Sequence, residues 1–264
     1  MTRLPFDSYR DHIAAESRRF RDVLASCDPS ARVPGCPDWD AADLLWHLAG
    51  VQRFWATIVS QRPVGPDNLE EPERPEGYDA LLSAFDASSA ALLSALDEAD
   101  PADAAWTWST EQTVGFTFRR QAHEALIHRL DAEQTAGVVT DLDPALAADG
   151  VDEVLDVMSG GSTPWGTFTG TDQHVRVDLT DADVSIWVQL GHFQGTDPED
   201  GVTYDEADLC VVPDSGAEVQ AVVAGTSTEL DAWLWRRADG AGISITGQPE
   251  ACSLFRAAVN QPAG

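Results

Sequence analysis

The chain has 264 residues, of which 43% are hydrophobic, so it can bury the core of one large domain or two ordinary ones. Its 16 basic and 45 acidic side chains give a formal net charge of −29, which disfavours nucleic acid and anionic membranes as partners. All the basic residues are arginine, which excludes a Schiff-base lysine, a lysine general base and a P-loop lysine.

The beginning of the chain and the cysteine pattern predict a cytoplasmic protein. Residues 1–10 mix charge with proline and do not resemble a signal peptide. No apolar run approaches the roughly 20 residues that cross a bilayer. The four cysteines show no CxxC pairing and fall two in each half, so we expect reduced thiols rather than a disulfide scaffold.

Apolar residues at helical spacing predict two helices at the start of the chain. The first stripe runs from Tyr9 to Cys27. A turn at residues 33–37 precedes the second helix, for which Asp40 is a suitable N-cap. Asp43, three residues later, can complete a capping box.

Two more helices are predicted before the middle of the chain. Residues 62–77 are rich in proline and glutamate and predict a surface loop. A third helix then runs through Leu81 and Leu96, and a fourth from about Thr117 to Thr135. Four amphipathic helices predict a helix bundle, followed by a hinge at residues 137–144.

The second half changes to a mixed pattern of helices and alternating strands. A Gly/Ser/Thr loop is expected at residues 160–170 and a hairpin turn at Thr180–Asp183. The predicted helices are 145–158, one capped by Ser227, and 249–259. The predicted strands are 174–179, 184–190, 209–212, 218–223 and 242–246. This half is therefore expected to be an α+β domain with an antiparallel sheet.

Three polar residues of the second and fourth predicted helices form a candidate metal site. Glu124 and His128 are four residues apart, so they share one face of a helix. His47 has Leu44 and Val51 as helical neighbours, so it faces the apolar side. Burying these groups unpaired is costly. A polar network would satisfy them, and so would a divalent metal: two histidines and one glutamate suit zinc and leave a position open for catalysis.

Five segments carry a resemblance to a known family. They are residues 33–48 (VPGCPDWDAADLLWHL), 106–109 (WTWS), 119–133 (RRQAHEALIHRLDAE), 146–153 (LAADGVDE) and 228–237 (TELDAWLWRR). Together they resemble the maleylpyruvate isomerase family of mycothiol-dependent enzymes, within the broader DinB-like superfamily. The metal triad of that family falls on His47, Glu124 and His128.

The resemblance implies a two-domain α+β protein. Residues 1–140 would form a DinB-like metal-binding four-helix bundle, and residues 141–264 the C-terminal α+β domain. It also implies that a divalent metal, zinc, holds mycothiol as a thiolate for attack on an electrophilic small molecule. Addition followed by elimination would give an isomerase, and addition or displacement alone a transferase. A monomer or homodimer is expected.

Further residues are assigned roles around this site. Arg236 is the candidate catalytic residue, as a clamp for a substrate carboxylate, although charge balance at a helix end would also explain it. Arg120 and Trp108 are assigned to cofactor binding, the alternative for Trp108 being a core or loop anchor. Asp131 or Asp43 could orient a ligand histidine, and plain helix capping is the alternative for Asp43.

Two other functions remain open on sequence grounds. The same ligands would support a zinc-dependent hydrolase that uses metal-bound water. A bundle that binds a small ligand without catalysis is also compatible with the fold.

Overall fold

The computed structural model describes residues 2–67, 69–70, 72–160, 165–198, 200–214, 216 and 218–260. The chain divides into two compact units, one of them Leu4–Leu142 and the other formed mainly by the chain from Asp143 onward. The first is helical and the second combines helices with a sheet, which confirms the predicted two-domain α+β class.

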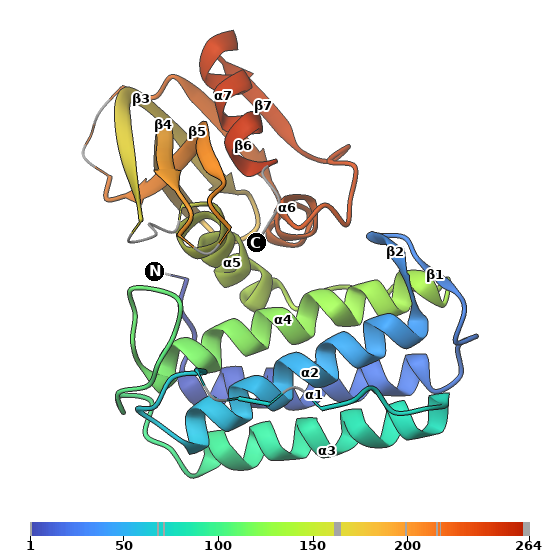
Figure 1. Ribbon diagram of the computed structural model, residues 1–264. Helices are drawn as coiled ribbons and strands as arrows, with labels where there is room; N and C mark the ends of the chain where they lie inside the picture. The colour runs from blue at the N-terminus through green and yellow to red at the C-terminus, as the bar shows by residue number, and fades with distance from the viewer. Residues whose placement is uncertain are drawn as a thin grey trace. The chain divides into compact units, whose positions relative to one another are not determined.

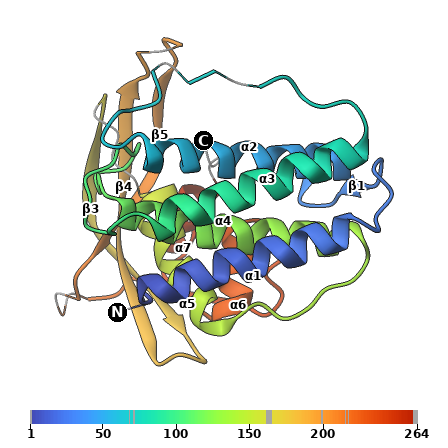
Figure 2. The same ribbon diagram turned by 90° about the horizontal axis from the view of Figure 1, so that it is seen from below.

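The first unit is a four-helix bundle with a short hairpin before its second helix. Its elements are α1 (Phe6–Leu24), β1 (Arg32–Val33), β2 (Cys36–Asp40), α2 (Ala41–Ser60), α3 (Tyr78–Asp97) and α4 (Val114–Thr135). Helix α1 packs beside α4, and α2 beside α3 (Figure 1). Helices α2 and α3 run in the same direction, because the described residues of the segment that joins them, 61–67, 69–70 and 72–77, return along the length of the bundle (Figure 2). This return segment lies along α2, the helix that carries one candidate metal ligand.

The capping residues explain where α2 and α4 begin. Asp40 and Asp43 form the predicted capping box, each side chain accepting from the other's backbone N–H at 2.9 and 3.1 Å. Helix α4 starts at Val114, three residues earlier than expected, because the hydroxyl of Thr113 accepts from the backbone of Phe116. The predicted turn at 33–37 lies within the β1–β2 hairpin, in which Val33 pairs with Cys36.

Helix α3 contradicts the expectation that no segment is long and apolar enough to cross a membrane. By length and composition alone it is, with a mean hydropathy of 1.2, because it is rich in alanine and leucine. A core helix of a soluble protein meets it equally well. Leu81, Phe85, Leu92 and Leu96 are buried within the bundle, so one face of α3 belongs to its core.

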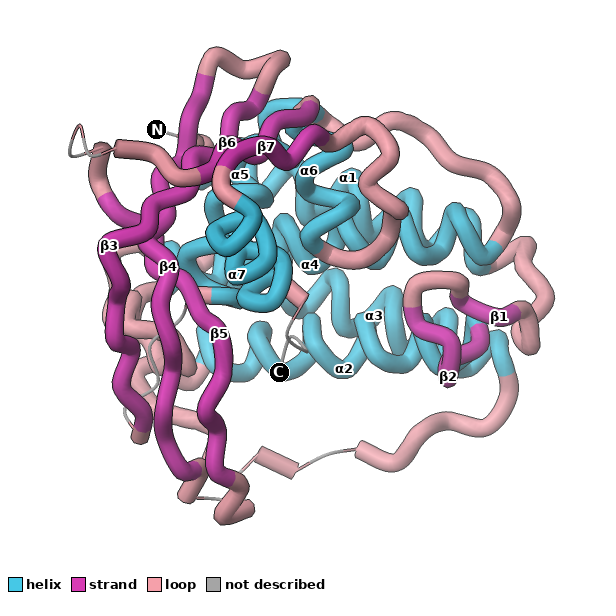
Figure 3. Tube along the Cα trace, turned by 90° about the horizontal axis from the view of Figure 1, so that it is seen from above, coloured by secondary structure: helices cyan, strands magenta, loops and turns pink. Residues whose placement is uncertain are grey.

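Within its described residues, the second unit has a five-stranded sheet with three α-helices and one π-helical segment. The helical elements are α5 (Pro144–Glu153), continued by the π-helix Val154–Ser159, α6 (Ser227–Leu234) and α7 (Pro249–Val259). The strands are β3 (Gly166–Leu179), β4 (Val184–Thr196), β5 (Thr203–Val212), β6 (Ala221–Gly225) and β7 (Ser244–Gly247). Their order is β5-β4-β3-β6-β7 (Figure 3). The β3–β6 pair is parallel and the other pairs are antiparallel, so the expected antiparallel sheet is mixed.

Several local expectations for this unit need correction. The loop predicted at 160–170 ends early, since strand β3 already begins at Gly166; residues 161–164 lie outside the described part of the chain. The predicted strand at 218–223 begins only at Ala221. The N-cap of α6 is Thr226, whose hydroxyl accepts from Glu229, while Ser227 instead donates to Asp181. The last predicted helix, Pro249–Val259, is confirmed.

Candidate metal centre

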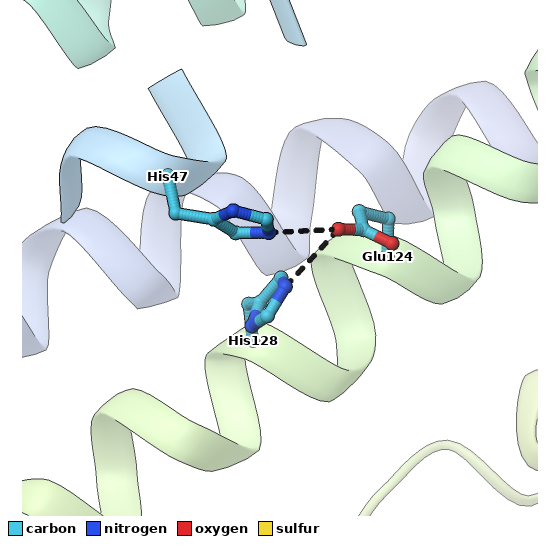
Figure 4. A group of neighbouring side chains, drawn as sticks. All are labelled: His47, Glu124 and His128. Atoms are coloured by element: carbon cyan, nitrogen blue, oxygen red, sulfur yellow. Dashed lines mark hydrogen bonds and ion pairs between the residues drawn. The ribbon is translucent and has the colours of Figure 1, made fainter. Parts of the chain in front are cut away.

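The structure brings His47, Glu124 and His128 together as expected (Figure 4). Nε2 of His47 lies 3.4 Å from Oε1 of Glu124, and Nε2 of His128 lies 3.0 Å from the same oxygen. One ligand atom from each residue lies within 4.8 Å of the others. The side chain of His47 is 34% exposed and that of His128 only 9%, so solvent reaches the triad from the His47 side.

The spacing of these atoms fits a metal ion. A tetrahedral ion with ligand bonds of about 2.0–2.1 Å separates its ligand atoms by roughly 3.4 Å. The two distances to Glu124, 3.4 and 3.0 Å, are close to that value. The oxygen of Glu124 faces both imidazole nitrogens (Figure 4), and the three donor atoms all lie within 4.8 Å of one another. Within the described residues this is the one group of His, Cys, Asp and Glu side chains that meets the geometric test for a metal site.

Two further residues of α4 hold the ligands in place. Oδ2 of Asp131 lies 3.0 Å from Nδ1 of His128, on the ring nitrogen that the triad does not use. Asp131 is fully buried, so this bond fixes the tautomer and orientation of the imidazole. Nη2 of Arg120 donates to Oε2 of Glu124 at 2.7 Å, which leaves Oε1 facing the histidines.

Within the triad, Glu124 and His128 form a charged pair. Burial would raise the pKa of the Glu124 carboxyl, but His128, His47 and Arg120 hold that pKa well below its usual range. Burial likewise lowers the pKa of His128, yet the carboxylates of Glu124 and Asp131 outweigh it and raise the pKa to about 9. The negative charge of Glu124 is therefore compensated by a positive charge, a role that a bound cation would take over.

Trp39 also belongs to the site, although no sequence pattern indicated it. Its indole packs against the His47 ring, with centroids 4.6 Å apart, and lies 6.4 Å from the His128 ring. Trp39 belongs to strand β2, directly before the cap of α2. The sequence shows a tryptophan eight residues before His47. It does not show the β1–β2 hairpin that places this tryptophan against the His47 ring.

The structure also shows the surroundings of Asp43 and Trp108, two other residues predicted for the site. The oxygens of Asp43 accept from the Asp40 backbone and from Arg74, which supports helix capping rather than a role on His47. Trp108 is 47% exposed and packs on Phe116 with centroids 5.2 Å apart. Phe116 precedes Glu124 by eight residues of α4, about 12 Å along the helix at 1.5 Å per residue. The role of Trp108 in cofactor binding stays a prediction.

Arg236 lies in the second unit, two residues after the end of α6. Its φ of 61° is the left-handed conformation, which is uncommon outside glycine. The backbone N–H of Arg236 donates to Trp233, and that of Arg237 donates to Ala232, so the turn that ends α6 holds Arg236 in this conformation. Its catalytic role likewise stays a prediction.

Comparisons with known proteins agree with this architecture. The family model described as the mycothiol maleylpyruvate isomerase N-terminal domain matches residues 10–133, and the C-terminal domain model of the same family matches residues 145–253. Among solved structures, the mycothiol-dependent maleylpyruvate isomerase and a mutant of it are similar to this chain. Each is 14% identical with a TM-score of 0.58, over 92% of this chain and 93% of the other, a likeness of fold. No curated protein matches the chain.

Proposed function

The chain belongs to the mycothiol maleylpyruvate isomerase family, whose two domain models together span it, and from that premise we propose that a metal centre activates its thiol. The ligands would be His47, Glu124 and His128, and the metal zinc. The observation that carries the proposal is the convergence of their ligand atoms within 4.8 Å.

A divalent ion held there would supply Lewis acidity, which lowers the pKa of a bound thiol so that the thiolate is the reacting form. The protein's own residues prepare the site for this. Asp131 forms a hydrogen bond with Nδ1 of His128, which keeps the Nε2 atom available for the metal. Arg120 orients the carboxylate of Glu124. Trp39 restrains the partly exposed ring of His47.

The reaction class follows from what a thiolate does. It adds to an electrophilic carbon of a small molecule; expulsion of the same thiol afterwards yields an isomer, and retention yields a conjugate. The enzyme is thus proposed to be an isomerase or transferase with mycothiol as cosubstrate.

Three residues outside the triad complete the proposal. Arg236 would bind an acidic group of the substrate, supported by its fixed left-handed backbone next to a second arginine. Trp108, half-exposed, would contact the thiol cofactor. Arg120 would also bind the cofactor, and its ion pair with Glu124 supports a positioning role as well.

The proposed setting is a cytoplasmic protein, monomeric or homodimeric, that meets small molecules. The net charge of −29 supports the expectation that neither nucleic acid nor a membrane is a partner. A small electrophile and a low-molecular-weight thiol are the proposed partners.

Cobalt substitution tests the metal and the thiol together. Mycothiol is titrated into the cobalt-loaded protein while the visible absorption spectrum is recorded. We expect a sulfur-to-cobalt charge-transfer band that is lost in His47→Ala, Glu124→Gln and His128→Ala. His192→Ala, an exposed histidine of β4, is the control and should retain the band.

Other outcomes separate the competing functions. If cobalt binds but thiols leave its spectrum unchanged, the thiol proposal is wrong and hydrolysis is assayed next, since the same ligands would support it. If no metal binds, the three residues form a buried polar network and a non-catalytic bundle is favoured.

A further inference from the structure

A cavity of about 870 Å³ borders the candidate metal centre within the first unit. It lies between α2 and the segment that returns from α2 to α3, and His47 and Trp39 form part of its wall. We call it the α2 cavity. Its volume falls in the range of about 300–1,000 Å³ that is typical of small-molecule pockets.

One ridge of α2 leads through this cavity away from the triad. His47, Gly50 and Arg53 follow one another at i, i+3 spacing, so each is the surface neighbour of the next, and all three line the cavity. Arg53 is about 9 Å from His47 along the helix, at 1.5 Å per residue. The ridge therefore joins a candidate metal ligand to a guanidinium group.

Gly50 leaves the middle of this ridge open. Glycine inside a helix is less favourable than alanine. Packing does not explain it here, since a β-carbon built at Gly50 meets no heavy atom within 4 Å outside its own helix turns among the described residues. A bound molecule can thus lie against the helix backbone between His47 and Arg53.

The charged groups of the lining are not all paired. Nη1 of Arg74 bonds to Oδ1 of Asp43 at 2.6 Å, so these two side chains neutralise each other. Glu70 is exposed, and its backbone oxygen, not its carboxylate, accepts from Nη1 of Arg53 at 3.3 Å. Arg53 is therefore the lining arginine that forms no ion pair with a described residue.

The guanidinium of Arg53 also lacks acceptors. Its Nε is buried and has no hydrogen-bond partner in the described part of the chain. A buried charged donor without an acceptor is costly. Carboxylates are abundant in a chain with 45 acidic residues, and other arginines use them, as Arg62 pairs with Asp103 at 2.9 Å. An arginine without such a pair beside a cavity indicates an anion supplied from outside the chain.

The remaining donors of Arg53 favour a carboxylate as that anion. Nη1 already bonds to the Glu70 backbone, which leaves Nη2 and Nε for the two oxygens of a planar acceptor. Trp46, Phe54 and Trp55 also line the cavity. Their apolar surfaces lower the local dielectric constant, so an ion pair there is stronger than one in open water.

We propose that Arg53 binds a carboxylate of the electrophile in the α2 cavity, with the reactive carbon of that molecule towards His47. The inference rests on the proposed thiol chemistry and adds to it a residue that selects an acidic substrate. Arg236 is proposed to bind an acidic group too, so the two assignments call for the same class of substrate. In the reaction, sulfur bonds to the β-carbon of a conjugated enone, the π electrons move to the neighbouring carbon, and that carbon takes a proton from solvent.

Binding is tested first with two unreactive ketones, in the zinc-loaded protein. 6-Oxoheptanoate carries a carboxylate at the end remote from its ketone, and 6-oxoheptanamide carries a neutral amide of nearly the same size there. Calorimetry should show at least tenfold tighter binding of the carboxylate. Arg53→Gln should reduce this preference to less than twofold, whereas Arg18→Gln, an exposed arginine of α1, should retain it.

The amide separates loss of the anion site from a disturbed fold. Its affinity should be the same in Arg53→Gln as in the unaltered protein. If Arg53→Gln loses amide binding too, Arg53→Lys decides, because it keeps the charge but not the planar guanidinium and should show a reduced preference. No measurable carboxylate binding, equal binding of the two ketones, or a full preference in the Arg53 variants would overturn the inference. The last result would place the carboxylate elsewhere, on the metal for example.

Turnover with mycothiol then links binding to reaction. 6-Oxohept-4-enoate and 6-oxohept-4-enamide carry the same enone, which two methylene carbons separate from the end group. We expect at least a tenfold higher kcat/KM for the carboxylate, mainly through a lower KM, and loss of that preference in Arg53→Gln. If the cobalt–thiol band is present but the preference is absent, only the role of Arg53 is wrong. If the band is absent, the thiol proposal itself fails, and ketone binding still decides whether Arg53 binds a carboxylate.

Discussion

Oδ2 of Asp131 lies 3.0 Å from Nδ1 of His128, while Nε2 of the same ring faces Oε1 of Glu124 at 3.0 Å. The imidazole is therefore held between two carboxylates, one that orients it and one that is proposed to share a metal with it. Both acidic residues lie on α4 with the histidine, at positions −4 and +3 from it. A single helix thus sets the geometry of two proposed ligands and their support.

Replacing Asp131 by asparagine should weaken metal binding without unfolding the protein. The neutral amide still fits beside Nδ1 but no longer makes His128 a stronger base, which costs about 10–100-fold in metal affinity at such positions. Competition of zinc against a colorimetric chelator measures it. Asp97→Asn, an exposed carboxylate paired with Arg10, is the control. Unchanged affinity in Asp131→Asn would contradict an orienting role.

Glu133 should contribute strongly to the stability of the bundle. Its carboxylate is fully buried and accepts from Arg19 at 2.7 Å, Arg129 at 2.9 Å and the Thr140 backbone at 2.8 Å. Glu133→Ala leaves these donors without their acceptor, and we expect a loss of about 3 kcal/mol in the free energy of unfolding. Urea denaturation measures it, with the exposed Glu98→Ala as control. Equal midpoints for the two variants would show that the network is unimportant.

Asp208 of β5 makes stability depend on pH. Burial raises the pKa of its carboxyl from 3.8 to about 6, the charge of Glu206 adds to this, and the Leu209 N–H opposes it. Between these values the folded state binds more protons than the unfolded state, so stability falls as pH rises through this window.

The variant Asp208→Asn removes this effect. We expect it to stabilise the protein by about 1 kcal/mol near neutral pH, allowing for partial solvent screening. The gain should shrink as the pH falls from about 6 towards 3.8 and vanish below 3.8, where the carboxyl is protonated in both states. Thermal melting across pH tests this, with the exposed Asp205→Asn as reference. A gain that is independent of pH would have another cause.

Arg236 allows its backbone and side-chain contributions to be separated. Glycine adopts the φ of 61° without strain whereas alanine does not, so Arg236→Gly should be about 1 kcal/mol more stable than Arg236→Ala. Both lack the guanidinium, so both should show an increased KM for a carboxylate substrate such as maleylpyruvate. Arg237→Ala distinguishes the neighbouring arginine. Full activity in both Arg236 variants would exclude the catalytic assignment.

The triad was predictable because residues close in the sequence indicate which way each of its side chains faces. Glu124 and His128 share a helix face by spacing alone, and the apolar neighbours of His47 indicate the inward side of α2. The position of Trp39 was not predictable, because Pro34 and Pro37 interrupt the alternation of apolar and polar residues that would indicate which way β2 faces.

The mixed sheet shows the same limit. Strands β3, β4 and β5 follow one another in an antiparallel meander that local patterns can suggest. Strand β6 pairs with β3 across 41 residues, from Leu179 to Ala221 at the nearest ends, and no local pattern encodes a parallel partner so distant. The cavity lined by His47 and Trp39 was equally unpredictable, since it depends on where Pro66, Pro72 and Arg74 lie.

The whole ligand set, with the residues that orient it and the cavity beside it, lies within Leu4–Leu142. During synthesis the chain leaves the ribosome from its N-terminus, and domains generally fold as units in that order. Every proposed metal ligand is therefore translated before the first strand of the five-stranded sheet exists. If the proposed centre binds a metal, loading need not await the finished polypeptide, because a ribosome-bound chain that ends in the second unit already contains every residue of the centre.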